Sequence, residues 1–512
     1  MEDIPRSLSS SILQSSLPER HPLSVDSELW LMAEQRTGEI LCAIEPVLAS
    51  EQKRREVIDD IQILLQGCFG IEVYPLGSVP LKTYLPDGDI DLTAFTFKNM
   101  EEDLARDVCY ILKAAEQDPQ FQVKNVQYIQ AKVKIVKFSI KNISVDISFN
   151  QIGGICALCF LEQVDQLAGG DHLLKRSIIL IKAWCLYESR ILGAYHGLIS
   201  TYTLVIMIVH IINLFHSSLP GPLAVLWRFL DYYSTFDWDN YCVSINGPVA
   251  ISSLPVIAGS LKNTGNCLLL SQEFWQNFRE CFSVQIKAPK NTGLQFPVKH
   301  LNIMDPLKEG NNLGHSVSRA NFHRIRRAFS HGAQCLREIL MLPAESMGAG
   351  LEKFFVNTLD RNGRGERPDV PVPVPAFGTG RSEVSDLCGD YSSYSTALLC
   401  GQWYLNHPPA VPLQPSTSSL VSQFQQKGST GVPFELTRCR QHTSSTRSKD
   451  VFVPGRPPYH LYTWPPCYLY PQPLCHLYTW PPSAAPSGFD RMGRPRVTDS
   501  VSPQTKIVDN VD

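Results

Sequence analysis

Apolar positions along the chain follow two periods, one of about 3.6 residues and one of two residues. The helical period first runs from Ser27 to about Gly67, where Pro46 should kink the end of one helix and Ala49-Ser50 marks a break before a second. It returns in later stretches and predicts helices over residues 100–117, 172–189, 201–215, 226–233, 274–282 and 319–340. Alternation typical of strands occupies residues 71–74, 89–97, 121–131, 133–140 and 144–149.

These patterns divide the chain into regions, and the predicted fold class is α+β. Residues 1–27 are polar and rich in Ser and Pro, which predicts a disordered arm. N-terminal helices follow over 28–66, strands and a helix over 67–165, and a mainly helical region over 166–345. The periodicity fails after Met347, so we predict a disordered tail over 346–512.

The tail has a composition of its own. It contains Pro371-Val-Pro-Val-Pro375, Ser, Thr and Gln tracts, and the segment His460–Pro466, which recurs as His476–Pro482. Dense proline favours an extended, unpacked chain. Two interpretations stay open: the tail docks a protein partner through its aromatic and proline residues, or it is a duplicated and poorly constrained end.

Candidate chemistry begins with a pair of carboxylates. Asp89 and Asp91 lie two residues apart in a predicted strand, so both leave the same face while Ile90 and Leu92 point into the core. Such a pair is repulsive unless a cation lies between the two groups. Carboxylate oxygens are hard ligands of the kind that hold Mg²⁺ together with substrate phosphates.

A Gly-Ser pair precedes these carboxylates. Gly77-Ser78 offers free backbone N–H groups and one hydroxyl, the groups that a triphosphate requires. The alternative interpretation of the whole stretch is a turn that leads into an edge strand, with Asp87-Gly88-Asp89 as ordinary turn chemistry.

Residues further along the chain favour a site over a turn. Asp146 lies in the apolar strand 144–149, where a carboxylate is costly unless it is paired or bound to a cation, and with Asp89 and Asp91 it makes a two-metal site plausible. Lys182 lies in the buried stripe of a predicted helix and needs an anionic partner such as a triphosphate. Ser200 and Thr201 are suitable caps at a helix start, where anions bind.

Composition and charge restrict the class of protein. The 512 residues carry a net charge of −3, so any nucleic-acid surface must be local. Two groups are candidates for such a surface: the lysines Lys132, Lys134, Lys137 and Lys141, and the arginines of 319–327. For each group, a plain solvated surface is the equal alternative.

The 15 cysteines form no regular framework and the N-terminus is not signal-like, so we expect an intracellular protein of the nucleus and/or cytoplasm. The longest apolar run, 203–215, is short and includes His210 and Asn213, so we predict a buried helix and no membrane segment.

Together these residues resemble a known family. Gly77-Ser78, Asp89-x-Asp91 and Asp146 resemble the nucleotidyltransferase signature of the DNA polymerase beta superfamily. The strand that ends at Asn150 is similar to the third-carboxylate strand of template-independent poly(A) polymerases and terminal uridylyltransferases. The same group is matched in order by Leu180-Ile-Lys-Ala-Trp184, Ser200-Thr-Tyr202, Asn302-Ile-Met-Asp-Pro-Leu307 and Asn311-Asn-Leu-Gly314. The resemblance covers about residues 29–340 and is closest to plant poly(A) RNA polymerase or terminal nucleotidyltransferase-like proteins with a PAP-associated (PAP/oligoadenylate synthetase substrate-binding) domain.

The resemblance implies an architecture. It implies a nucleotidyltransferase domain over 67–165, a mixed sheet flanked by helices, and a mainly α-helical substrate-binding domain over 166–345. The helices of 28–66 should pack on the central domain, and the disordered tail lies outside the resemblance.

The resemblance also implies roles for individual residues. Asp89 and Asp91 would bind two divalent ions, Mg²⁺ or Mn²⁺, and Asp146 would bind one of them beside the primer 3′-hydroxyl. Gly77 and Ser78 would contact the phosphates of the incoming nucleotide, Lys182 would hold the triphosphate, and Ser200 or Thr201 would bond it too. Tyr202 would stack on the base, which the loop from Asp305 through Asn311 to Asn312 would recognise.

Two departures from the family pattern bear on these roles. Many relatives carry a second lysine four residues after the position of Lys182, where this chain has Leu186. Either triphosphate binding is weakened or Lys175 substitutes. Uridylyl-specific relatives often place a His at the position of Asn311, so its absence favours ATP over UTP.

The expected function is a template-independent RNA 3′-nucleotidyltransferase that adds AMP from ATP to RNA 3′ ends. Its partners would be an RNA 3′ end, a nucleoside triphosphate and, through the Pro-rich tail, a protein. The alternatives are a terminal uridylyltransferase, a catalytically weak or inactive RNA-binding scaffold that keeps the fold, and an enzyme that modifies a small molecule or a protein hydroxyl.

Overall fold

The computed structural model describes residues 27–407 apart from 119–120, 132, 255–267, 283–295, 371–375 and 381–384. The predicted arm up to residue 26, Lys132, the proline run 371–375 and the repeat at 460–482 lie outside the described residues. All the described residues belong to one compact unit.

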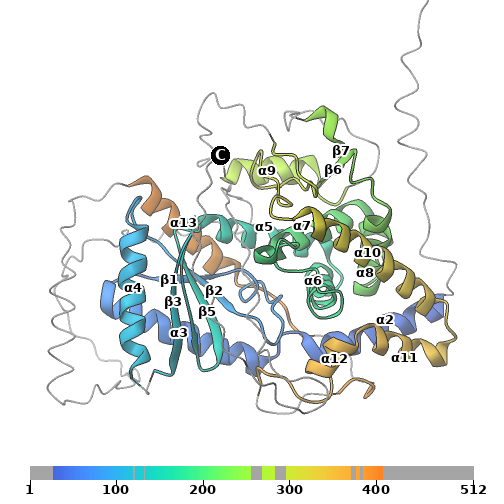
Figure 1. The fold of residues 1–512 in the computed structure, drawn as a ribbon, viewed down its shortest axis with the longest axis horizontal. Helices are drawn as coiled ribbons and strands as arrows, with labels where there is room; N and C mark the ends of the chain where they lie inside the picture. Colours follow the sequence, from blue (N-terminus) through green and yellow to red (C-terminus); the bar gives the residue numbers. More distant parts are fainter. Residues whose placement is uncertain are drawn as a thin grey trace, which may run out of the picture. The chain divides into compact units, whose positions relative to one another are not determined.

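A five-stranded mixed sheet forms where the strand pattern predicts it (Figure 1). Its order is β1-β2-β5-β4-β3, in which β2 and β5 are parallel and the other neighbours antiparallel. The strands are β1 (Val73–Leu76), β2 (Ile90–Ala94), β3 (Val123–Gln130), β4 (Lys134–Ile140) and β5 (Ile143–Phe149). The α+β class and the mixed sheet flanked by helices are therefore confirmed.

One face of this sheet packs on helices α3 (Leu48–Phe69) and α4 (Glu101–Glu116). Ile90 and Leu92 of β2 and Val145 and Ile147 of β5 are all 0% exposed in this cluster. Because side chains alternate along a strand, the residues between them leave by the opposite face. That alternation sends Asp91 and Asp146 away from this core.

The second half of the described chain is helical and shares a larger hydrophobic cluster. Its helices are α5 (Ile152–Ala168), α6 (Leu173–Ala183), α7 (Thr201–Phe215), α8 (Pro222–Thr235), α9 (Gln272–Phe282) and α10 (Arg319–Leu340), with a hairpin of β6 (Tyr241–Ser244) and β7 (Gly247–Ala250). A π-helical turn, Trp184–Glu188, directly follows α6, and short 3-10 turns lie at 194–196, 216–218 and 251–253. The mainly α-helical second domain is thus present.

Helix α7 is the most apolar element of this half. Residues 201–218 are long and apolar enough to cross a membrane by length and composition, the one such stretch in the described part of the chain. Residues Tyr202–Asn213 are nevertheless all buried in the protein. His210 Nδ1 bonds Ser244 O at 2.7 Å and Asn213 Nδ2 donates to Ile245 O at 2.9 Å, so the two polar side chains have partners. The helix is a core element, as its sequence predicts.

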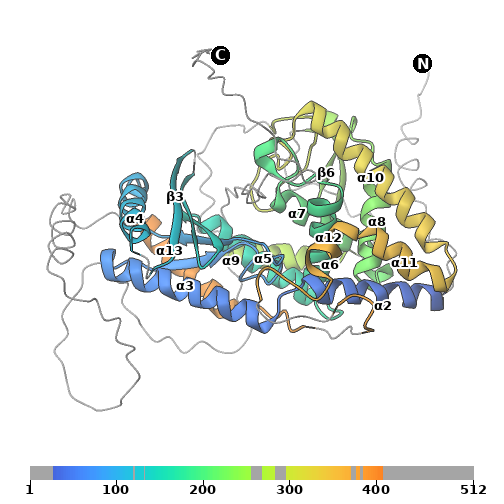
Figure 2. The same ribbon diagram turned by 60° about the horizontal axis from the view of Figure 1, so that its bottom comes forward.

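Helix α2 (Ser27–Ile44) departs from the prediction. It packs on α6, α8 and α11 (Ala344–Phe354) rather than on the sheet, as Figure 2 shows for its run beside α11. Its buried residues Ala33, Ile40 and Ile44 belong to the cluster of the helical half, whereas Val57 of α3 belongs to that of the sheet. Only the second N-terminal helix therefore packs on the central domain.

The predicted start of the tail at residue 346 is wrong. The chain continues through α11, α12 (Val356–Asn362) and α13 (Tyr391–Asn406), and described residues extend to 407. The helical period does not fail there: Met347, Leu351, Phe355 and Leu359 recur every four residues and are at most 3% exposed. Gly348 and Gly350, which disfavour a helix, lie within α11 and obscure this period in the sequence.

Candidate active site

Adjacent strands bring the three predicted carboxylates together. Asp91 of β2 is the parallel register partner of Asp146 of β5, and Asp89 immediately precedes β2. One oxygen from each of Asp89, Asp91 and Asp146 lies within 4.8 Å of the others. This is the spacing expected of ligands around a shared cation.

The environment of these carboxylates favours a cation. Asp91 is 6% exposed and Asp146 0% exposed, and Oδ1 of each is buried without a hydrogen-bond partner among the described residues. Burial, and then the charge of Asp89, raise the pKa of Asp91 well above its usual value and that of Asp146 to about 6. Oxygens left unpaired in a buried acidic site fit Mg²⁺ or Mn²⁺, which would relieve both the desolvation and the repulsion. That these residues bind metal stays a prediction.

Gly77 lies directly against the carboxylates. Its φ is +75°, and a Cβ built there would lie 2.7 Å from Asp91 Oδ2. The position therefore requires glycine for two reasons: the positive φ of its backbone and the close approach of the Asp91 carboxylate. The turn that follows is closed by Thr83 N, which donates to Ser78 O at 2.8 Å. Gly77 thus borders the acidic cluster. That Gly77 and Ser78 contact the phosphates of a nucleotide stays a prediction.

Lys182 reaches the same place from α6. Its side chain is partly buried, and Nζ lies 3.5 Å from Thr83 O in the turn that follows Ser78. Burial lowers the pKa of the Lys182 ammonium, while Asp89 and Asp91 act in the opposite direction. A cation so placed beside the carboxylates can meet the charge of a phosphate.

Lys137 is a site residue that the sequence did not single out. It is the cross-strand partner of Asp146 in the antiparallel pair β4–β5, and its Nζ donates to Asp146 Oδ2 at 2.8 Å. Neither interpretation of the strand lysines, a solvated face or a guide for a polyanion, included this ion pair. The register of two adjacent strands is the signal that could have found it.

A second network surrounds the predicted base-recognition residues. Tyr202 Oη donates to Asp305 Oδ1 at 3.4 Å, and Asn311 Nδ2 donates to Asp305 Oδ2 at 2.8 Å. Burial raises the pKa of Asp305 to about 6, although these hydrogen bonds act to lower it. Ser200 caps α7 by accepting from Thr203 N at 3.0 Å, and Thr201 starts the helix. Tyr202, Asp305 and Asn311 are thus brought together, and stacking on a base stays a prediction.

Lys175 cannot substitute for a missing second lysine. Its side chain is 0% exposed, and Nζ lies 2.9 Å from Glu162 Oε2 and 2.6 Å from Leu387 O. This ammonium is committed to a buried structural pair. The prediction that Lys175 holds phosphate in place of a second lysine is therefore wrong. The spacing of the lysines in the sequence does not show that Glu162 on α5 is the partner of Lys175.

Leu186 lies four residues after Lys182, where the resemblance to the family leads us to expect a second lysine. It lies on the π-helical turn after α6 and packs partly buried against the core of the helical half. Leu186 therefore has a packing role here.

The loop before Asp89 is held by Arg54, another residue that the prediction missed. This α3 arginine is 1% exposed, and its Nη2 donates to Pro86 O at 3.3 Å and Gly88 O at 3.0 Å. Its guanidinium lies 4.1 Å from the ring centre of Tyr84 and 3.6 Å from Asp369 Oδ2. Arg54 falls on the same helical stripe as Val57 and Ile61, which is the signal that a buried arginine leaves in a sequence.

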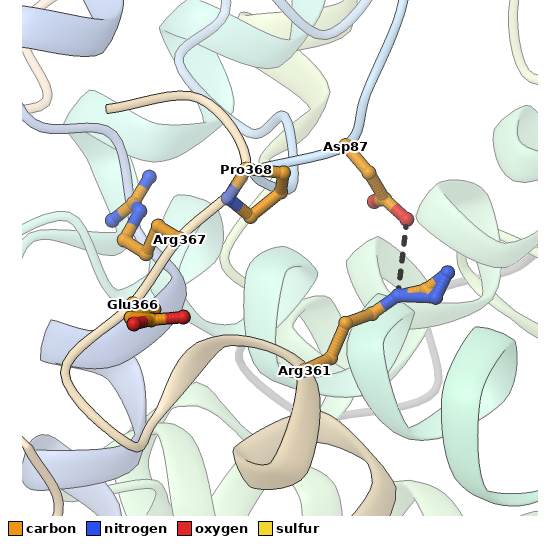
Figure 3. A pocket seen from close by; sticks show the side chains of 5 residues that line it. All are labelled: Asp87, Arg361, Glu366, Arg367 and Pro368. Atoms are coloured by element: carbon orange, nitrogen blue, oxygen red, sulfur yellow. Dashed lines mark hydrogen bonds and ion pairs between the residues drawn. The ribbon is translucent and has the colours of Figure 1, made fainter. Parts of the chain in front are cut away.

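Asp87 is more than a turn residue. It accepts hydrogen bonds from the Tyr187 hydroxyl and from Arg361 Nε, the latter at 3.4 Å, as the dashed line in Figure 3 shows. A cavity of about 300 Å³ lies there, lined by Asp87, Arg361, Glu366, Arg367 and Pro368. Its lining does not include the three carboxylates, so it is a neighbour of the candidate site and not the site itself.

Comparison with known proteins agrees with this geometry. Residues 34–163 match the central palm domain of mitochondrial-like poly(A) RNA polymerase, and residues 168–359 match the PAP/OAS1 substrate-binding domain. The change from one to the other lies next to the predicted boundary between 165 and 166. Together the two matches cover more than half of the 512 residues.

Curated relatives carry corresponding names. Poly(A) RNA polymerase CID14 of Cryptococcus neoformans is 32% identical over 146 residues, which are 28% of this chain and 18% of that protein. Poly(A) RNA polymerase GLD2 of Danio rerio is 27% identical over 231 residues, 43% of this chain and 45% of that protein. The chain thus spans less than half the length of these relatives.

Among solved structures, that of the Cid1 poly(U) polymerase is similar at 18% identity and a TM-score of 0.44, covering 61% of this chain and 95% of that one. The two domain matches and the curated relatives are what decide the identity of the chain. It belongs to the poly(A) RNA polymerase-like nucleotidyltransferases, in which a palm domain precedes a PAP/OAS1 substrate-binding domain.

Proposed function

We propose that the protein is a template-independent RNA 3′-nucleotidyltransferase that adds AMP from ATP to RNA 3′ ends. The observation that carries this proposal is the three-carboxylate cluster of Asp89, Asp91 and Asp146, with Gly77 in contact and Lys182 beside it. The curated relatives support it, since they are named poly(A) RNA polymerases.

In this proposal a primer 3′-oxygen forms a bond to the α-phosphorus, and the bond to the bridging oxygen breaks as pyrophosphate leaves. Asp89, Asp91 and Asp146 would hold Mg²⁺ or Mn²⁺, which would stabilise the negative charge on the attacking and leaving oxygens. Asp146 would lie beside the primer 3′-hydroxyl and help its deprotonation, and its Oδ1 has no hydrogen-bond partner among the described residues. Lys182 and Ser78 hold the phosphates.

Tyr202, Asp305 and Asn311 provide the base-binding part of the proposal. The ring of Tyr202 stacks on the base, while Asp305 holds the Asn311 amide in place through their 2.8 Å hydrogen bond. An amide presents both a donor and an acceptor, which suits the edge of adenine. We therefore propose ATP over UTP as the substrate. A protein partner for the Pro-rich tail and an intracellular location belong to the same proposal.

Primer extension on a short RNA with each of the four nucleotides separately tests this function. We expect extension with ATP in Mg²⁺ or Mn²⁺, and its loss in Asp89→Ala. The matched control is Asp103→Ala, an acidic side chain that is 75% exposed on α4, the helix that packs on the face of the sheet opposite to Asp91 and Asp146. Failure of the unaltered protein to extend several RNAs with any nucleotide would contradict the proposal. Metal-dependent ATP binding without extension would instead support a binding or scaffold role.

A further inference from the structure

A second cluster of metal-ligating side chains lies where the start of α6 meets the segment before α13. His172, Asp386 and Cys388 each offer one ligand atom, and these atoms lie within 4.8 Å of one another. His172 Nε2 is 3.7 Å from Cys388 Sγ and 3.9 Å from Asp386 Oδ1. None of these residues belongs to the nucleotide site.

The ring of His172 is already oriented as a ligand. Its other nitrogen, Nδ1, lies 2.7 Å from Oδ2 of Asp165, whose side chain is 2% exposed. Metal-binding histidines in proteins typically donate their second ring N–H to a carboxylate, which fixes the tautomer and the ring plane. Asp165 is itself held by Lys175, whose backbone N donates to Oδ1 at 3.3 Å and whose Nζ lies 3.8 Å from Oδ2. Nε2 is left facing Cys388 and Asp386.

The distances fit a tetrahedral ion of the size of zinc. With bonds of about 2.05 Å to nitrogen, 2.1 Å to oxygen and 2.3 Å to sulfur, tetrahedral angles separate nitrogen from sulfur by about 3.6 Å and nitrogen from oxygen by about 3.4 Å. The observed separations of 3.7 and 3.9 Å differ from these by a few tenths of an ångström. Such a shift is within reach of the exposed Asp386 side chain.

The backbone that carries the other ligands is also fixed. Cys388 N donates to Asp386 Oδ1 at 2.9 Å, and Leu387 O accepts from the buried Lys175 Nζ at 2.6 Å. His172 and the residue before it both have positive φ, at 62° and 51°. An ion here would find its ligands on two segments that are far apart in sequence and already in place.

We propose that His172, Asp386 and Cys388 bind one Zn²⁺, with water as the fourth ligand. Imidazole nitrogen, thiolate and carboxylate oxygen form the mixed donor set that zinc accepts. The ion fastens the segment before α13 to the corner between α5 and α6. That segment leads to Tyr394, whose hydroxyl donates to Pro80 O in the turn that contains Ser78. The ion therefore stabilises the C-terminal segment against the palm.

Cobalt substitution of the full chain tests this site. Co²⁺ bound by a thiolate gives a charge-transfer absorption that the all-carboxylate cluster cannot produce, so the two sites are distinguished. We expect this absorption at one Co²⁺ per chain, displaced by Zn²⁺. It should be lost in Cys388→Ser and in His172→Ala, while Asp165→Asn should weaken Zn²⁺ binding by about 10- to 100-fold.

The chain offers a matched control in Cys335→Ser. Cys335 Sγ lies 3.5 Å from His331 Nε2 on α10, a cysteine–histidine pair outside the proposed site. This variant should keep the absorption. Asp386→Asn, altered at a side chain that is 78% exposed, tests the third ligand without risk to the core. The proposal would be overturned if the unaltered protein showed no such absorption, or if Cys335→Ser lost it. It would also be overturned if Cys388→Ser kept the absorption while its metal-free circular dichroism matched that of the unaltered protein.

Discussion

At the residue scale, Gly77 carries the sharpest constraint in the candidate site. An alanine Cβ there would lie 2.7 Å from Asp91 Oδ2, so Gly77→Ala must displace a predicted metal ligand. Gly70 has a similar φ, +65° against +75°, but nothing within 4 Å of its would-be Cβ. Both substitutions cost about 1–2 kcal/mol of backbone strain, and only one creates the clash.

We therefore expect Gly77→Ala to abolish extension and to weaken Mn²⁺ binding measured by calorimetry at least tenfold, while Gly70→Ala keeps both. The thermal midpoints of the two variants should fall by similar amounts. Equal Mn²⁺ affinity in the two variants would show that Asp91 does not need its present position.

Lys137 gives a second prediction at this scale. Its ammonium, 2.8 Å from Asp146 Oδ2, offsets part of the carboxylate repulsion in the metal-free protein and opposes a cation at the same oxygen. Lys137→Met should lower the thermal midpoint of the metal-free protein and tighten Mn²⁺ binding severalfold. Lys134→Met, on the same strand but bonded to Ala131 O, is the control. Unchanged or weaker Mn²⁺ binding in Lys137→Met would count against the opposing role of Lys137.

At the element scale, the start of α8 depends on a carboxylate from α2. Gly221 offers no side-chain cap, and the backbone N–H groups of Leu223 and Ala224 donate to Glu34 at 3.1 and 2.9 Å. Burial raises the pKa of Glu34 to about 7 from its usual 4.5, against these two hydrogen bonds. Because the folded-state pKa is raised, the contribution of this group to stability is fully present below pH 4.5 and is lost as the pH rises through 7.

Glu34→Gln removes this titration. The thermal midpoint of the variant relative to the unaltered protein should therefore rise between pH 5 and pH 8, as measured by circular dichroism. Glu56→Gln, at an exposed position on α3, should show the same relative midpoint at both pH values. A relative midpoint for Glu34→Gln that is constant with pH would mean that Glu34 keeps an ordinary pKa in the fold.

Elements with an uninterrupted period were predictable from the sequence. The spacing predicts a helix at 319–340, and α10 covers Arg319–Leu340. Asp146 could be predicted as a candidate site residue from the sequence because its carboxylate interrupts an otherwise apolar strand. What the sequence does not contain is long-range partnership. Lys175 and Leu387 are 212 residues apart, and only the fold shows that this lysine is structural. Lys137 likewise became a site residue through strand register.

At the scale of the whole molecule, the chain after α12 returns to the palm. Arg367 and Asp369 form a buried pair at 2.9 Å, and Asp369 also accepts from Ser50 Oγ at 2.5 Å and pairs with Arg54, which holds the loop before Asp89. Further on, α13 packs on α5, and its Gly401 lies against Phe95 and Ile152. The family match ends at residue 359, so these contacts lie outside the two matched domains.

A chain ended after residue 362 should therefore lose activity, although it keeps both family matches in full. It would leave Arg54 and Lys175 without part of their buried partners, and breaking a buried pair costs about 3–5 kcal/mol. A chain ended after residue 407 keeps every described contact and is the matched control. We expect the shorter chain to show a lower thermal midpoint and little extension, and the longer one to match the full chain. If the two shortened chains were equally active, the first 362 residues would be enough to hold the loop before Asp89 in position. Residues 363–407 would then have no part in ordering the site.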